Sequence, residues 1–280
     1  MKILFSGDSF CEGTELEGLE HSIEQRDRLR YSNVVKEYLD ELFGLEVTFD
    51  NIGYSGYSND EITRDTVEYC ENNEVDVAVV EFSHPQRWAY YSEVHKRWFS
   101  MDQYEHFYGC HPEHKVIEIC EWWDANVKSR TQYIDNFYKN IFLLEQYFKA
   151  KNIPYVFLQL EEWTNEELES CDTVWKKLVD NKCIKGVTPS QEAFGCTEYS
   201  IEETDAICPT WWMNDPELMS EYRTLDHRDE KTDFATGDEE DTHRWLGGWH
   251  PGKNGHIAIA KWIIQNMTDN EKLHHLFPGI

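Results

Sequence analysis

The stretch "MKILFSGDSFCEG" (residues 1–13) joins a short apolar run to an abrupt polar turn. Residues 2–6 are predicted to form a buried strand, and Gly7, Asp8 and Ser9 follow it directly. A second glycine, Gly13, comes soon after the serine. A serine on a glycine-flanked turn at the carboxyl end of a strand is a candidate nucleophile. The alternative is an ordinary turn serine that hydrogen-bonds to the next helix.

The rest of the chain alternates between strand and helix patterns. Apolar runs predict further strands within 45–53, 75–82 and 153–160. Helical spacing of apolar residues predicts helices over 24–43, 130–151 and 253–267, and Ser58 or Asn59 is a candidate cap for another. This alternation predicts an α/β fold with a parallel sheet covered on both faces. We expect one domain, residues 1–280, with insertions at about 86–128 and 184–245.

Charge and composition argue against several classes of partner. The chain has 54 acidic and 26 basic residues and a net charge of −28, which disfavours nucleic acid and anionic membrane surfaces as partners. No apolar window is long enough for a membrane span, and the N-terminus does not have the pattern of a secretory signal. The eight cysteines form no CxxC pair and are expected to be reduced thiols, so a cytoplasmic location is expected.

Candidate catalytic groups follow the predicted strands at the edge where ligands gather in a parallel sheet. After the serine turn come "NIGYSGYSND" (51–60), "EFSHPQRW" (81–88) and, before the last helix, "GGWHPGKNGH" (247–256). A serine, a glycine turn with backbone N–H groups and a late histidine are the minimum set for acyl transfer.

These segments resemble the sequence blocks of the SGNH (GDSL-type) hydrolases. The matching residues, in family order, are Gly7-Asp8-Ser9 with Gly13, then Asn51, Gly53 and Gly56, and finally His250-Pro251 with Gly255-His256. The resemblance implies a flavodoxin-like three-layer α/β/α fold. It implies that Ser9 is the nucleophile and His250 its base, and that the backbone N–H groups of Ser9 and Gly56 bind the oxyanion. Asp8 belongs to the same catalytic block, and no cofactor or metal is implied.

The chain departs from the family pattern at two places. The third family block supplies an asparagine to the oxyanion, whereas 81–88 has none, so His84, Gln86 and Arg87 are candidate replacements. The family also has an aspartate three residues before the histidine, a position that is Gly247 here. Asp241, its neighbours Glu239 and Glu240, or a backbone carbonyl remain candidates to orient His250. Loss of catalysis is the other interpretation.

Further features leave other interpretations open. His106, Cys110, His111 and His114 lie close together in the first insertion, but their spacing matches no strong zinc pattern, and a polar lid is the preferred interpretation. His256 is expected to be a packing histidine. Tryptophans near the motifs suit either packing of the insertions or contact with sugar rings.

We therefore expect an esterase that removes a small acyl group, most plausibly acetyl, from a polar substrate such as a carbohydrate. The main alternative is a non-catalytic carbohydrate-binding or assembly protein on the same scaffold. A metal-dependent hydrolase built on the 106–114 histidines is a weaker alternative. The oligomeric state is not predicted.

Overall fold

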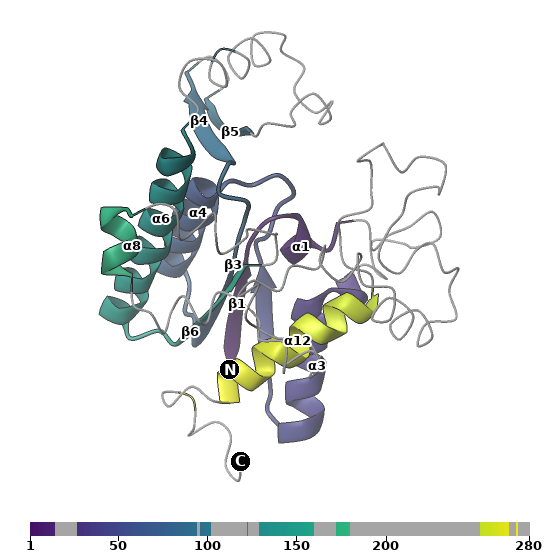
Figure 1. The fold of residues 1–280 in the computed structure, drawn as a ribbon. Helices are drawn as coiled ribbons and strands as arrows, with labels where there is room; N and C mark the ends of the chain where they lie inside the picture. The colour runs from purple at the N-terminus through teal and green to yellow at the C-terminus, as the bar shows by residue number, and fades with distance from the viewer. Residues whose placement is uncertain are drawn as a thin grey trace, which may run out of the picture.

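The computed structural model describes residues 1–14, 27–93, 96–101, 122, 129–159, 172–179, 253–268 and 273. Its centre is a parallel sheet of four strands in the order β2-β1-β3-β6 (Figure 1). The strands are β1 (Lys2–Ser6), β2 (Thr48–Asn51), β3 (Val77–Phe82) and β6 (Tyr155–Gln159). The direction of winding changes between β1 and β3. In a doubly wound sheet the ligand crevice lies at this point, beyond the carboxyl ends of the strands.

Helices cover both faces of the sheet (Figure 1). One face is covered by α3 (Tyr31–Phe43) and α12 (Lys253–Thr268), and the other by α4 (Asn59–Asn72), α6 (Arg130–Lys151) and α8 (Val174–Leu178). Alternate residues of β3 divide between the two apolar cores: Val77 and Val79 pack with α3 and α12, and Ala78 and Val80 pack with α4 and α6. The predicted three-layer α/β/α fold is confirmed.

Local sequence signals explain where the main helices begin and end. The capping box of Ser58 and Glu61 starts α4, and α6 ends at Asn152 in the left-handed conformation (φ 55°). The helix predicted over 130–151 is confirmed residue for residue. The prediction of one continuous helix over 24–43 is wrong at Arg30, which has an extended backbone (φ −66°, ψ 149°). Residues 27–29 are helical, and α3 begins at Tyr31.

A β-hairpin occupies the start of the first predicted insertion. Strands β4 (Trp88–Ser92) and β5 (Arg97–Met101) pair antiparallel, with Tyr91 opposite Trp98. Figure 1 shows this hairpin projecting beyond the carboxyl end of β3. The candidate catalytic turn after β1 lies at the same end of the sheet. The hairpin was not predicted, since residues 86–128 show no clear period in sequence. Within the described residues, no helix is long and apolar enough to cross a membrane.

Candidate active site

Ser9 begins a one-turn helix at the carboxyl end of β1. This helix, α1 (Ser9–Glu12), is capped by Asp8, whose carboxylate Oδ1 accepts a hydrogen bond from the Phe10 N–H at 3.1 Å. It ends at Gly13, which has the left-handed φ of 79° that favours glycine. Ser9 is 3% exposed. The chain therefore holds this serine in a short, capped turn next to the sheet.

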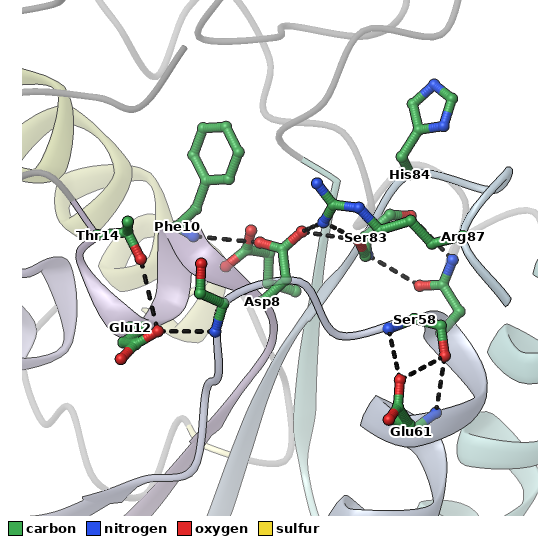
Figure 2. Close-up of polar contacts among 12 residues, drawn as sticks. Asp8, Phe10, Glu12, Thr14, Ser58, Glu61, Ser83, His84 and Arg87 are labelled. Carbon is green, nitrogen blue, oxygen red and sulfur yellow. Dashed lines mark hydrogen bonds and ion pairs between the residues drawn. The ribbon is translucent and has the colours of Figure 1, made fainter. Parts of the chain in front are cut away.

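The glycine turn after β2 is fixed against α1. The Tyr54 N–H donates to the Gly7 carbonyl oxygen at 3.2 Å, and the Ser55 N–H donates to Glu12 Oε2 at 2.7 Å (Figure 2). The next residue, Gly56, has a positive φ of 83°. Because Glu12 belongs to α1, its carboxylate ties the backbone around Gly56 to the helix that begins with Ser9. The first two motif blocks are thus joined in space.

Asn51, the asparagine of the second block, also connects these segments. Its Nδ2 donates to the Cys11 carbonyl oxygen at 2.8 Å and to Ser32 Oγ at 3.1 Å. Its Oδ1 accepts from the Gly53 N–H at 2.9 Å. A Cβ on Gly53 would lie 2.6 Å from Cys11 Cβ, so a side chain there would clash. The turn after β2 and α1 are therefore closely packed.

The segment after β3 reaches the same point through Arg87. Its Nη1 forms a buried ion pair with Asp8 Oδ2 and donates to Ser83 Oγ at 2.6 Å, while Ser83 Oγ donates to Asp8 Oδ2 at 2.7 Å (Figure 2). The Asn59 side chain is hydrogen-bonded to both backbone groups of Ser83. Its Oδ1 accepts from the Ser83 N–H at 2.8 Å, and its Nδ2 donates to the Ser83 carbonyl oxygen at 2.9 Å. A cation is thereby fixed beside the residue that precedes Ser9.

The three candidate replacements for the missing asparagine differ in position. Arg87 contacts Asp8, whereas Figure 2 shows the His84 ring pointing away from Asp8 and Arg87. His84 Nδ1 accepts from the Gln86 N–H at 3.3 Å, and Gln86 Oε1 is buried without a hydrogen-bond partner in the described part of the chain. Of the three, the structure brings Arg87 next to the Ser9 turn.

The environment of Asp8 keeps it ionised. Complete burial, the largest single effect, raises the pKa of its carboxyl, but the Arg87 guanidinium and the hydrogen bonds from Glu81, Ser83 and the Phe10 N–H together more than offset it. The pKa of Asp8 is therefore held below its ordinary value.

Beneath this cluster, Tyr31 and His256 fasten α3 and α12 to the site. The Tyr31 hydroxyl donates to Glu81 Oε2 at 3.1 Å, and the Tyr31 N–H donates to His256 Nδ1 at 3.1 Å. The two rings are stacked, with centroids 5.7 Å apart. Because Nδ1 accepts a hydrogen bond, it is not protonated, and the fully buried imidazole has the packing role expected for it.

Several predicted residues cannot be placed. His250, Asp241, Glu239, Glu240 and Gly247 lie outside the described residues, as do the 106–114 histidine cluster and the second insertion. In the part of the chain that the structure describes, no group of three or more His, Cys, Asp or Glu residues could hold a metal ion.

Four residues of the site were missed in the sequence: Glu12, Asn59, Glu81 and Ser83. Glu81 carries a visible signal, because it is the one charged residue in the apolar strand "VAVVEF". A charged group in a fully buried strand needs a partner and so indicates a polar cluster. Glu12 and Ser83 carry no such signal, because their roles depend on contacts with segments distant in sequence.

Gly7 allows the close approach of α1 and β3, which predicts the effect of adding a methyl group there. A Cβ at this position would lie 2.8 Å from Cys11 Cβ and 2.8 Å from Glu81 Oε2. We expect Gly7→Ala to lower the free energy of unfolding by about 1–3 kcal/mol through overpacking. Urea unfolding measures this. For comparison, Gly44→Ala meets nothing within 4 Å but has a φ of 62°, so it gives the cost of backbone strain without overpacking. A loss below about 0.5 kcal/mol for Gly7→Ala would contradict the tight packing.

Comparison with known proteins gives structural similarities only. No family model matches the chain, and no curated protein matches it in sequence. Among solved structures it is similar to the acetylxylan esterase Axe2 from Geobacillus stearothermophilus, with 12% identity and a TM-score of 0.43 over 94% of this chain and 92% of that one. It is also similar to the esterase EstA from a Pseudoalteromonas species, with 12% identity and a TM-score of 0.41 over 96% and 99%.

Another similar structure is a member of the lipolytic G-D-S-L family from Veillonella parvula, with 13% identity and a TM-score of 0.37 over 96% of this chain and all of that one. The similarity to these proteins is low in both measures. The functional argument therefore rests on the chain's own residues.

Proposed function

We propose that this protein is a serine ester hydrolase of the SGNH type, with Ser9 as nucleophile and His250 as base. One observation carries the proposal: three segments distant in sequence are fixed around Ser9 at the switch point of the sheet. They are the turn of Ser9 itself with its Asp8 cap, the Gly56 turn held through Glu12, and the segment of Arg87, which is held by Asp8. A turn serine with only a local role would not need this set of buried contacts.

In the proposed reaction, Ser9 Oγ attacks the ester carbonyl carbon and passes its proton to a ring nitrogen of His250. The tetrahedral oxyanion is held by the N–H groups of Ser9 and Gly56. When the intermediate collapses, the alcohol leaves with the proton from His250 and an acyl group remains on Ser9. Water then attacks the acyl carbon and gives one proton to His250. When the second tetrahedral intermediate collapses, His250 returns that proton to Ser9 Oγ and the carboxylic acid is released. Asp241 or a neighbouring carboxylate orients His250.

Arg87 is proposed to take the place of the missing asparagine. Its Nη1 contacts both Asp8 and Ser83. A fixed cation beside the nucleophile turn would stabilise negative charge that develops on the carbonyl oxygen. Since the Arg87 side chain is held at both Asp8 and Ser83, it needs no reorganisation during the reaction.

A carbohydrate ester is the proposed substrate class, and the hairpin supports it. Tyr91 and Trp98 are 41% and 43% exposed, and their rings meet edge to face with centroids 5.5 Å apart. The Arg64 guanidinium lies 4.7 Å from the centre of the Trp98 ring. The hairpin begins directly after Arg87: Tyr91 lies on β4, the strand that leads out of the site, and Trp98 lies opposite it on β5. Flat rings of this kind suit contact with the apolar face of a sugar.

The aromatic pair predicts a selective effect on substrates. We expect Trp98→Ala to raise the KM for acetylated oligosaccharides about three- to tenfold, the value of one aromatic contact. Hydrolysis of p-nitrophenyl acetate should be unchanged because that substrate has no sugar ring to bind. Steady-state kinetics on both substrates measures this. The control is Leu178→Ala, because Leu178 is also an exposed apolar residue but lies on α8. Equal effects of Trp98→Ala on both substrates would contradict a sugar contact.

The function as a whole is tested by screening short-chain p-nitrophenyl esters and acetylated oligosaccharides with the wild type and Ser9→Ala. Hydrolysis by the wild type alone supports the proposal, and equal hydrolysis by both contradicts it.

A second candidate is a non-catalytic carbohydrate-binding or assembly protein. The missing asparagine and the glycine at position 247 favour it. It predicts that glycan binding persists unchanged in Ser9→Ala and that the wild type hydrolyses none of these esters.

A further inference from the structure

Two carboxyl groups lie buried against each other beneath the Ser9 turn. Asp8 is fully buried and Glu81 is 1% exposed. We propose that Glu81 carries a proton at neutral pH and donates it to Asp8 in a hydrogen bond. Asp8 and Glu81 would then form an acid–carboxylate pair with a single proton, and Glu81 would be a positioning residue for the nucleophile turn.

The contacts of Asp8 show which partner is ionised. Asp8 accepts from the Phe10 N–H at 3.1 Å, from Ser83 Oγ at 2.7 Å and from Arg87 Nη1. All three partners are donors, so Asp8 is the carboxylate. Glu81 is also hydrogen-bonded to Asp8. A hydrogen bond between two carboxyl groups requires a proton on one of them, and that proton therefore belongs to Glu81.

Both carboxyl oxygens of Glu81 lie in buried surroundings. Glu81 Oε2 accepts from the Tyr31 hydroxyl at 3.1 Å. Oε1 is also buried. The contact is built into the sequence at Gly7, because a Cβ there would lie 2.8 Å from Glu81 Oε2. A side chain before Asp8 would push the turn after β1 away from Glu81 on β3.

The charges of the surrounding groups agree with this assignment. Burial raises the pKa of the Tyr31 hydroxyl and of the Cys11 thiol well above their ordinary values, so both are neutral. On α12, His256 is unprotonated at Nδ1, and Arg30 at the start of α3 pairs with Asp27 at 3.4 Å.

Within this cluster the ionised Asp8 already balances the Arg87 guanidinium. A second buried carboxylate in contact with the first would add repulsion and desolvation cost. A proton on Glu81 removes that repulsion and adds a hydrogen bond that holds Asp8, and through it the start of α1.

Infrared spectroscopy tests the proton directly. At pH 7 the wild type is expected to show the C=O stretch of a protonated carboxylic acid, and Glu81→Gln is expected to lack it. Glu145→Gln is the matched control, because Glu145 is also fully buried but forms an ion pair with Lys149. Tyr31→Phe should shift the frequency of the band by removing the hydrogen bond to Oε2. Absence of the band from the wild type, or its persistence in folded Glu81→Gln, overturns the proposal.

The stability of the two proteins provides a second readout that does not depend on enzyme activity. The folded wild type holds a proton that an unfolded glutamate releases above about pH 4.3. Wild-type stability should therefore fall as pH rises from that value toward neutrality, relative to Glu81→Gln, which has no such proton to lose. Urea midpoints across this range measure the difference. A constant difference between the two proteins would contradict a shared proton.

The bearing on catalysis rests on the proposed function. If the protein hydrolyses esters, Glu81→Gln should remain active and keep its activity to higher pH than the wild type, whereas Glu81→Ala should lose activity at every pH. If no ester is hydrolysed, the infrared band still shows whether Glu81 is protonated. Failure of the proposed function and failure of this proposal can therefore be told apart.

Discussion

Ser9→Ala is expected to lower kcat for ester hydrolysis on the order of 10⁶-fold, the loss found when the nucleophile is removed from a serine protease. Alanine removes the oxygen that forms the acyl-enzyme, while Asp8 keeps its cap contact with the Phe10 N–H. The thermal midpoint should therefore change little. Steady-state kinetics on a short-chain ester and a thermal melt measure the two quantities on the same preparation.

The matched control is Ser6→Ala, which removes another buried serine of the same segment. Ser6 Oγ accepts from Thr66 Oγ1 at 2.7 Å, in a contact with α4. This variant should lose at most about 1–3 kcal/mol of stability, from the buried Thr66 hydroxyl left without its partner, and should keep its activity. Equal loss of activity in both variants would contradict a specific role for Ser9.

Arg87→Met is expected to cost about 3–5 kcal/mol of unfolding free energy, because it leaves the buried Asp8 carboxylate without its cation. We also expect kcat to fall about 100- to 1,000-fold, the value of one oxyanion donor. The control is Lys139→Met, whose pair with Asp60 (3.3 Å) is about one-third exposed and should cost less than about 1 kcal/mol. Urea unfolding and ester kinetics separate the two effects. Equal costs for Arg87→Met and Lys139→Met would contradict the importance of the buried pair.

A double variant separates the effect of leaving the Asp8 charge unpaired from the effect of replacing the Arg87 side chain. Asp8→Asn combined with Arg87→Met removes both charges, so it should recover part of the stability lost in Arg87→Met alone. Activity should stay low, because the oxyanion would still lack its cation. A double variant less stable than either single variant would contradict this account.

The same ion pair predicts how stability depends on pH. The pKa of Asp8 is lower in the folded protein than in the unfolded chain, so its contribution is complete above the unfolded value of about 3.9 and is lost as pH falls below it. Arg87→Met should show a smaller acid-side loss than the wild type, since the variant has less to lose. Urea midpoints measured from neutral pH downward test this sign.

Much of the sheet could be predicted because its signals are local. The runs within 75–82 and 153–160 are continuous and apolar, as strands buried on both faces require, and they became β3 and β6. The helix predicted over 130–151 from its apolar spacing is α6, and the structure adds a local cap at Ser129. The β4–β5 hairpin was missed, since its pairing of Tyr91 with Trp98 depends on contacts with α4, such as Arg64 on Trp98, as well as on sequence.

In the site, too, the features with local sequence signals could be predicted, and those that depend on distant contacts could not. Motif spacing was enough to predict that the Ser9 turn and the Gly56 turn meet, and the contacts of Glu12 and Tyr54 join them. It could not choose among His84, Gln86 and Arg87. That choice depends on Asp8, which lies 79 residues from Arg87 in sequence. His250 and Asp241 stay predictions.

The most direct test of an activated nucleophile is a fluorophosphonate probe, applied to the wild type and to Ser9→Ala and read by intact mass. The account predicts a single covalent adduct on the wild type, mapped to the peptide that contains Ser9, and none on the variant. No adduct on either protein, or the same adduct on both, would contradict the claim that Ser9 is the catalytic nucleophile.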